Sequence, residues 1–271
     1  MKRFRPSVPM QAVAVLLALA FLAAADSNSA DIANWITYYY MHPQPDDVPA
    51  RVREMAALGV FRKESAAPPV IAFLAEVFRE NPSRIAGWFE TLRNISPDAR
   101  LAIIRAAWES NTKEGAAALN ALGAQKERDL ASQVRKQKPI DLAKDQIDSP
   151  AFLDMLWGTF SASGKAWPVE RVIGVVSWEV PAEGTPNRTG VILIIGAARW
   201  SLSSNAFQHR RVYEICQNTL PDLNPEGRKE LNEILQKVNE RKERDATRPS
   251  AAVDRPSSSP RRLRSLSSLA S

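Results

Sequence analysis

The chain contains a single cysteine, Cys216, and a histidine seven residues before it, His209. These are the residue types from which a thiolate nucleophile and its base are built. On a helix, a spacing of seven places both side chains on one face but roughly 10 Å apart, at about 1.5 Å per residue. An activated thiolate needs its base within hydrogen-bond reach. The spacing therefore argues against a catalytic pair, and we expect Cys216 to pack as a small core hydrophobe.

The other residue types that commonly carry chemistry are sparse. His42 is the only further histidine, and no HExxH, CxxC or HxH pattern is present, so the sequence predicts no zinc site. The acidic pair Asp46 and Asp47 lies beside two prolines and is typical of a solvated loop that leads into a helix. Neither a Walker loop, a GxGxxG pattern nor a GxSxG elbow occurs. We therefore predict no metal, no cofactor and no catalytic residue.

One group of candidate binding residues lies near the start of the chain, in the aromatic segment Trp35–Asp47. Three consecutive tyrosines in this segment cannot all face the interior of a helical protein. At least one ring is therefore expected to reach the surface, and Tyr39, Tyr40 and His42 are candidates for a ligand or partner contact. The alternative is that this segment only fills a groove next to the chain terminus.

A second group follows the most apolar stretch after the N-terminus, Val191–Ala198. We expect this stretch to be a buried helix that carries Trp200 into the core. A tight polar corner is expected at 203–209, followed by an amphipathic helix through Val212 and Ile215. The candidates for ligand or partner binding here are Trp200, Asn205, Gln208 and His209. The alternative is that these polar side chains only cap helices and bond exposed backbone.

Apolar residues recur at helical spacing along most of the chain, as at Val70, Phe73, Leu74, Val77 and Phe78. Several such segments begin with Ser-Pro or Asn-Pro, a pattern typical of a helix cap and its first helical residue. The turns between them follow no fixed period. We therefore predict an all-α fold, an irregular stack of helical hairpins that is either α-solenoid-like or a multi-helix bundle.

The segment 171–196 is the main ambiguity in this prediction. It is rich in β-branched residues, so it could form a β-hairpin across the loop PAEGTPNRTG. However, Val169, Val172, Ile173 and Val176 match one face of a helix, and Pro168 suits a helix start. We therefore favour a helix and keep the hairpin as the alternative.

Composition divides the chain into five parts. Residues 1–25 are predicted to be a signal peptide, and residues 26–123 an N-terminal helical subdomain. A polar connecting helix or linker is expected at 124–148, followed by a C-terminal helical subdomain at 149–244. The Ser/Pro/Arg-rich tail, 245–271, has too few apolar residues to pack and is predicted to be disordered.

The signal-peptide prediction depends on three features of the first 25 residues. Basic residues precede an apolar run from Ala12 to Ala25, and Ala23–Ala25 forms a small-residue cleavage site. A retained anchor is the alternative, but the apolar run is shorter than the roughly 20 residues that cross a bilayer. No other apolar run approaches that length, so no transmembrane segment is expected after cleavage.

The mature protein is therefore expected to begin at Asp26. N-terminal sequencing of the exported form measures this directly. A protein that begins at Met1 and stays in the membrane would contradict the prediction of cleavage.

The formal net charge of +6 and the pI near 9.6 invite a nucleic-acid interpretation. Half of that charge comes from Lys2, Arg3 and Arg5, and the other half from the tail beyond Arg244. The segment between them is therefore close to neutral. It lacks the basic stripe that nucleic-acid binding requires, so no nucleic-acid partner is expected.

The sequence leaves two functional hypotheses. The first is an exported, non-enzymatic helical protein, periplasmic or secreted, that binds another protein or a component of the cell envelope. A bacterial source suits it better than a eukaryotic one, because a single cysteine allows no intramolecular disulfide. The alternative is a small-ligand-binding protein or an enzyme that uses the polar residues at the central corner.

Overall fold

The computed structural model describes residues 27–247. The predicted signal peptide and the tail beyond Thr247 lie outside this range. The described part of the chain is all-α, as predicted, and residues 27–247 contain no strand. Its α-helices are α2 (Ser27–Tyr38), α3 (Val48–Ala57), α4 (Ala67–Glu80), α5 (Ile85–Thr91), α6 (Pro97–Glu109), α7 (Lys113–Asn120), α8 (Gln125–Arg135), α9 (Pro150–Ser163), α10 (Ala166–Val176), α11 (Arg188–Gln208), α12 (Arg210–Thr219) and α13 (Pro225–Thr247). Short 3₁₀ helices are η1 (Tyr39–Met41), η2 (Pro45–Asp47), η3 (Val60–Arg62), η4 (Pro82–Arg84) and η5 (Leu220–Asp222).

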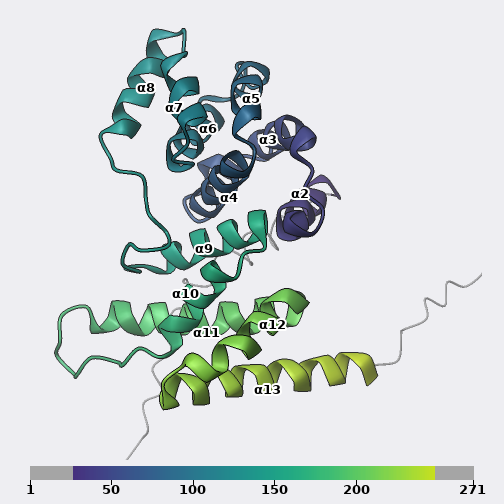
Figure 1. Ribbon diagram of the computed structural model, residues 1–271, viewed down its shortest axis with the longest axis vertical. Helices are drawn as coiled ribbons and strands as arrows, with labels where there is room; N and C mark the ends of the chain where they lie inside the picture. The colour runs from purple at the N-terminus through teal and green to yellow at the C-terminus, as the bar shows by residue number, and fades with distance from the viewer. Residues whose placement is uncertain (1–26, 248–271) are drawn as a thin grey trace, which may run out of the picture.

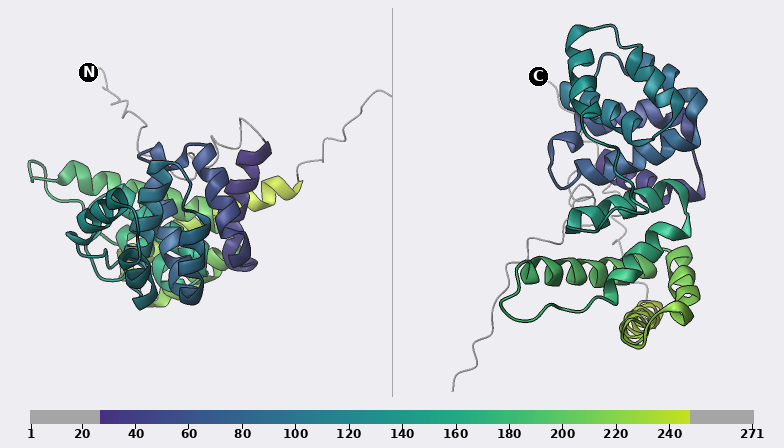
Figure 2. Two further views of the ribbon diagram at one scale, coloured as in Figure 1. Left: turned by 90° about the horizontal axis from the view of Figure 1, so that it is seen from above. Right: turned by 60° about the vertical axis from the view of Figure 1, so that its left-hand side comes forward.

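The helices form two groups that meet at α9 (Figures 1 and 2). Helices α2 to α8 make up the upper part of Figure 1, and α10 to α13 make up the lower part. Helix α9 crosses between them and contacts α4 and α2 on one side and α10 and α11 on the other. Each group has its own cluster of buried apolar side chains.

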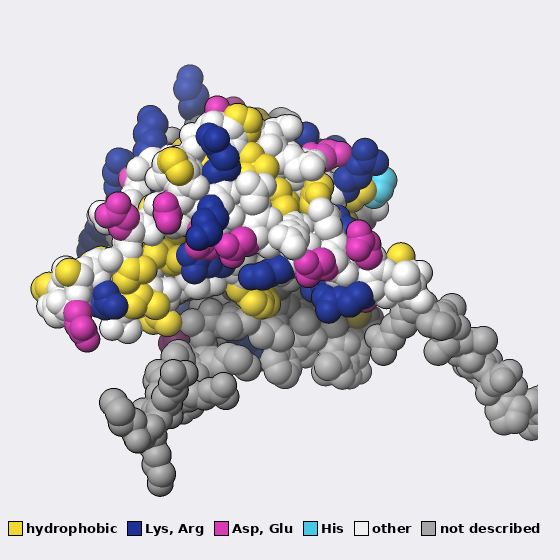
Figure 3. Space-filling model, turned by 90° about the horizontal axis from the view of Figure 1, so that it is seen from below, with side chains coloured by type: hydrophobic (Ala, Val, Ile, Leu, Met, Phe, Trp, Pro, Cys, Tyr) yellow, Lys and Arg dark blue, Asp and Glu magenta, His cyan; other side chains and the backbone are white. Residues whose placement is uncertain are grey.

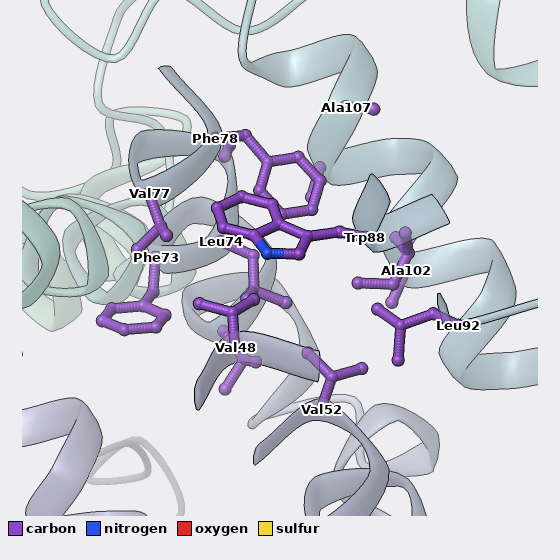
Figure 4. Packing of buried hydrophobic residues seen from close by; sticks show 14 of the residues in the cluster. Val48, Val52, Phe73, Leu74, Val77, Phe78, Trp88, Leu92, Ala102 and Ala107 are labelled. Atoms are coloured by element: carbon purple, nitrogen blue, oxygen red, sulfur yellow. The ribbon is translucent and has the colours of Figure 1, made fainter. Parts of the chain in front are cut away.

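The N-terminal core is built around α4, whose sequence is apolar on almost every side. Phe73, Leu74 and Phe78 are fully buried. The indole of Trp88 from α5 packs against Phe78 with ring centroids 5.2 Å apart, and Val48 from α3 lies nearby (Figure 4). A helix that is hydrophobic all round needs neighbours all round, which explains why short helices surround α4.

The C-terminal core consists of side chains from one face of α9 and from the apolar stripes of α10 to α13. Val172, Ile173 and Val176 of α10 are buried, which confirms the helix prediction for this segment. The alternative β-hairpin at 171–196 is wrong. Residues 177–187 form an irregular loop, and α11 begins at Arg188.

Helices α4 and α9 form the most extensive contact between two helices of the described chain. A glycine permits this approach. A Cβ atom built on Gly158 would lie 2.2 Å from the carbonyl oxygen of Pro69. Because any larger residue at 158 would collide with backbone, Gly158 sets the distance between the two halves of the protein.

The tight polar corner predicted at 203–209 is wrong. Helix α11 continues without interruption to Gln208, and only His209 leaves the helical conformation, with φ −116° and ψ 114°. Asn205 shows why the helix continues, because its side-chain nitrogen donates to the carbonyl oxygen of Ser201 in the preceding turn, at 2.9 Å. A polar side chain that bonds back along its own helix does not end that helix.

The stretch 191–198 was expected to be buried, and it is only half covered. Ile194, Ile195 and Ala198 face the C-terminal core, whereas Ile192 and Leu193 are 42% and 38% exposed. Trp200 was expected in the core and is 38% exposed. The reason is tertiary, because α9, α10, α12 and α13 contact parts of α11, and the packing leaves Ile192, Leu193 and Trp200 only partly covered.

The polar segment at 124–148 consists of a helix and a connection. Helix α8 lies against the N-terminal half, where Ala131 is buried and Glu127 pairs with Arg100 of α6. Residues 136–149 then lead to α9, and the Trp108 indole nitrogen donates to the carbonyl oxygen of Gln137 at 2.9 Å. None of the described helices is both long enough and apolar enough to cross a membrane.

Candidate functional site

The two groups of candidate residues meet near α2, α9 and α11, through Tyr40 and His209, which are 169 positions apart in sequence. The Tyr40 hydroxyl lies 3.2 Å from His209 Nδ1, and the Gln208 side-chain nitrogen donates to the Tyr38 hydroxyl at 3.3 Å. The N-terminal tyrosine segment is therefore held against the end of α11. This contact links the N-terminal and C-terminal halves of the chain.

Aromatic rings surround the imidazole of His209. The ring of Phe160 from α9 lies 5.9 Å from it, and Tyr38 and Tyr40 lie 5.2 and 5.8 Å away. Gly164, which ends α9 with φ +62°, lets the Tyr40 ring pack directly on the backbone. A side chain at 164 would displace that ring, because a Cβ there lies 2.6 Å from a Tyr40 ring carbon.

Two predicted site residues do not belong to this junction. Tyr39 points into the N-terminal core, where its ring packs on Trp35 and Phe73, and burial raises the pKa of Tyr39 to about 12. His42 is exposed, and its side chain makes no hydrogen bond or ion pair with any described residue. The structure thus brings together Tyr40, Gln208 and His209 and separates Tyr39 and His42 from them.

A small cavity of about 50 Å³, here called the junction cavity, lies between α2, α4, α9 and α11. Trp200, Asn205 and His209 line it from the C-terminal half, which places three predicted residues on its wall. Its other lining residues are Ile36, Thr37, Ala66, Pro69, Val70, Asp154, Trp157, Gly158, Ser161 and Ser201. A cavity of this size has room for a few water molecules or for one small polar group.

The two titratable residues of the junction cavity are Asp154 and His209, and burial acts on them in opposite directions. Burial raises the pKa of Asp154 to about 7 and lowers the pKa of His209 to about 4. Burial disfavours the charged form in both cases. His209 is consequently a neutral imidazole near pH 7, and Asp154 is about half ionised there because its charged form is unfavourable.

These groups do not form a catalytic pair. Asp154 and His209 make no hydrogen bond to each other, and the one ring nitrogen of His209 with a protein partner faces Tyr40. Cys216 is fully buried, and its burial raises the pKa of the thiol to about 12. As the spacing predicted, Cys216 packs in the C-terminal core.

Three residues that were not predicted from the sequence, Asp154, Trp157 and Ser161, extend along one face of α9 into the junction cavity. One signal could have pointed to them. Asp154 is the only charged residue in the helix PAFLDMLWGTFSAS. A charge within a nearly all-apolar helix is costly unless it is paired or functional.

A second, larger cavity opens between α4, α6, α9 and the connection at 138–149. Its volume is about 970 Å³, and its lining is mainly apolar, with Ile71, Phe152 and Met155 among the lining residues. Glu109 at its edge accepts a hydrogen bond from the Ile140 backbone nitrogen at 2.7 Å, and burial raises the pKa of this carboxyl. We call this cavity the connection cleft. In the described range, no cluster of His, Cys, Asp or Glu could hold a metal ion.

Trp200, which was expected in the core, is partly exposed, and His209, which was expected in a polar turn, is buried. The expected effects of substituting these two residues on stability therefore change places. Trp200→Ala is expected to lower the free energy of unfolding by less than about 2 kcal/mol, because the ring is already 38% exposed. His209→Ala is expected to cost about 1–3 kcal/mol, because it removes a buried ring that is 3% exposed and leaves the Tyr40 hydroxyl without its partner. Chemical denaturation of both variants measures this order. A Trp200→Ala loss larger than that of His209→Ala would show that Trp200 supports the core.

Comparison with known proteins finds no matching family model, no matching curated protein and no matching solved structure.

Proposed function

We propose that this chain is an exported, non-enzymatic interaction module that binds another protein through the exposed apolar face of α11. The supporting observation is the exposure of Ile192, Leu193 and Trp200 on one helix, at 42%, 38% and 38%. We call these three residues the α11 face.

The α11 face has the composition of a binding surface. Leu193 and Trp200 are seven residues apart, so they lie on the same side of the helix, about 10 Å apart along its axis. Grouped exposed apolar side chains mark interaction sites in soluble proteins, and Trp is enriched among residues that dominate binding energy. The small residue Gly196 between them leaves room for a partner to approach the helix backbone.

Charge and chemistry support binding rather than catalysis. Seen from below, acidic and basic side chains alternate over the described surface without a large region of one sign (Figure 3). Such a surface does not favour a polyanion such as nucleic acid. The polar groups of the junction cavity include no hydrogen-bonded nucleophile and base. Export to the periplasm or the medium rests on the N-terminal segment 1–25, and a bacterial envelope suits a protein with one cysteine.

A photo-crosslinking amino acid placed at Leu193 tests this function in the cells that produce the protein. We expect one discrete adduct, which Ile192→Glu abolishes because a charge cannot be buried unpaired in the interface. The matched control is the same photo-crosslinker at Leu101, which is 40% exposed on α6 and remote from α11 in sequence. Equal adducts at both positions, or none at Leu193, would contradict the proposal. An adduct of twice the mass of the chain would identify the partner as a second copy.

Binding of a small ligand is a second candidate function, and the connection cleft favours it. Its volume of about 970 Å³ falls within the range of small-molecule sites, roughly 300–1,000 Å³. The junction cavity, at about 50 Å³, is too small for such a ligand. Native mass spectrometry of the protein purified from its own source is expected to show a bound small molecule in this case. Loss of that species in Met155→Trp, which narrows the cleft by placing an indole on its wall, would assign it to this site.

A further inference from the structure

Asp154 is a carboxylate that lacks a counter-charge in the junction cavity. Its side chain makes no hydrogen bond or ion pair with any described residue. No lysine or arginine is among the residues that line the cavity, and the one histidine there is neutral near pH 7 because burial lowers its pKa to about 4. An ionised carboxylate without a paired cation is unfavourable in such surroundings.

A buried carboxylate on α4, the helix that packs against α9, offers a comparison with Asp154. Glu76 of α4 is 1% exposed, and two cations satisfy it. Lys165 donates to Glu76 at 3.0 Å, and Arg79 forms a second ion pair with it. Lys165 also pairs with Glu80, so two carboxylates of α4 share this cation. Asp154, on the neighbouring helix α9, receives no such partner.

The walls of the junction cavity suit a small cation. Trp157 and Trp200 both line it, and an indole face turned toward the cavity would attract positive charge. Acceptor atoms are present as well. The Asn205 side chain donates through its nitrogen to Ser201 and leaves its oxygen without a protein donor, and the Ser161 hydroxyl has no hydrogen bond to a described residue.

The opening of the junction cavity lies beside the α11 face. Trp200 is the most exposed residue of the lining, Asp154 and Ser161 are half-buried, and the remaining lining residues are buried. Trp200 therefore belongs both to the cavity and to the α11 face. A group that enters the cavity beside Trp200 would therefore lie at one end of the surface that would carry the partner.

We propose that the junction cavity binds a primary ammonium group, supplied by a lysine side chain of the protein that docks on the α11 face. The source of the lysine rests on the proposed function above, whereas the affinity of the cavity for an ammonium group is measurable without any partner. The complex would place the lysine stem along Trp200 and its nitrogen against the Asp154 carboxylate, in the manner of the Lys165–Glu76 pair.

A primary ammonium fits better than the other biological cations. It carries three N–H donors on a compact head, and the cavity offers carboxylate, amide and hydroxyl oxygens as acceptors. A quaternary ammonium has no donor for those oxygens and is larger. A guanidinium is broad and planar and needs a wider, flat space than about 50 Å³ provides.

Titration of the full mature chain with n-butylammonium tests the proposal, with the indole N–H signals of its tryptophans followed by NMR. We expect saturable shifts of two indole signals, assigned through Trp157→Phe and Trp200→Phe, with a dissociation constant of about 1–10 mM. Asp154→Asn is expected to weaken binding at least tenfold, and Asp222→Asn, which changes an exposed carboxylate outside the cavity, is expected to leave it unchanged. The neutral butan-1-ol and the quaternary tetramethylammonium are expected to bind at least tenfold more weakly than n-butylammonium.

The outcomes separate this inference from the proposed function. Absence of saturable shifts, or equal binding by Asp154→Asn, overturns the ammonium site even if the crosslink at Leu193 forms. Equal binding of butan-1-ol overturns it too, because the cavity would then accept any alkyl chain. If n-butylammonium binds but no adduct forms at Leu193, the site stands and its cation comes from a source other than a docked protein. With both results positive, Asp154→Asn is expected to reduce the crosslink yield at Leu193.

Discussion

Asp154→Asn is expected to make the protein more stable at pH 8, by about 2–4 kcal/mol. Burial raises the pKa of this carboxyl from 3.8 to about 7, and each pKa unit corresponds to about 1.4 kcal/mol. The full difference is reduced because the side chain is half-buried and partly screened by solvent. The asparagine keeps the shape and removes the charge. Chemical denaturation at a series of pH values measures the gain.

The dependence on pH has a definite sign. Between pH 3.8 and 7 the folded state holds a proton on Asp154 that the unfolded state has released, so stability falls as the pH rises through this window. Asp154→Asn removes that fall. The variant is therefore expected to match the stability of the native protein at pH 3 and to reach its full gain in stability above pH 7. His209 acts in the opposite sense, because its lowered pKa makes stability rise between pH 4 and 6.5.

Between pH 4 and 6.5 the contributions of Asp154 and His209 to the native protein therefore oppose each other, whereas Asp154→Asn keeps the rise that His209 produces. The raised pKa of Glu109 adds the same fall to both proteins, so it does not change the difference between them. Asp222→Asn is the matched control, because this exposed carboxylate should leave the pH profile unchanged. A loss of stability in Asp154→Asn at pH 8 would show that the carboxylate has a stabilising partner. Together with loss of ammonium binding, a gain in stability would mark Asp154 as a residue that serves binding at the expense of stability.

Gly158→Val is expected to lower the free energy of unfolding by about 3 kcal/mol or more. A Cβ at this position lies 2.2 Å from the Pro69 carbonyl oxygen and 3.3 Å from the Phe73 backbone nitrogen. Backbone atoms inside a core cannot move aside as a flexible side chain can, so overpacking here forces α4 and α9 apart. Urea denaturation measures the loss, and the separation should also expose the tryptophans at the junction.

Gly174→Ala is the control for this substitution. Gly174 lies within α10, and a Cβ there meets no atom within 4 Å. This variant is expected to be at least as stable as the native protein, because alanine favours a helix by about 1 kcal/mol relative to glycine. A stable Gly158→Val protein would mean that the two halves do not depend on their close approach at α9.

The sequence by itself determined the helices and most of the residues that they bury. The spacing of Phe73, Leu74 and Phe78 predicts the inner faces of α4, and the structure buries all three. The same reasoning decided correctly for a helix at α10, because its apolar residues repeat at helical and not at strand spacing. Local periodicity carries this information, since a helix is closed by hydrogen bonds between residues that are near in sequence.

Only the tertiary structure decided which face of α11 is covered and what lies at its end. Val191–Ala198 is apolar on every side, so its sequence cannot indicate that Ile192, Leu193 and, further along the helix, Trp200 face outward. Likewise, the sequence placed Tyr40 and His209 in two separate candidate groups, and their contact depends on how α2 and α11 pack against α9. Asp154 became a candidate only when α2, α4 and α11 enclosed it without a cation. Contacts between residues distant in sequence arise from packing, which no local pattern encodes.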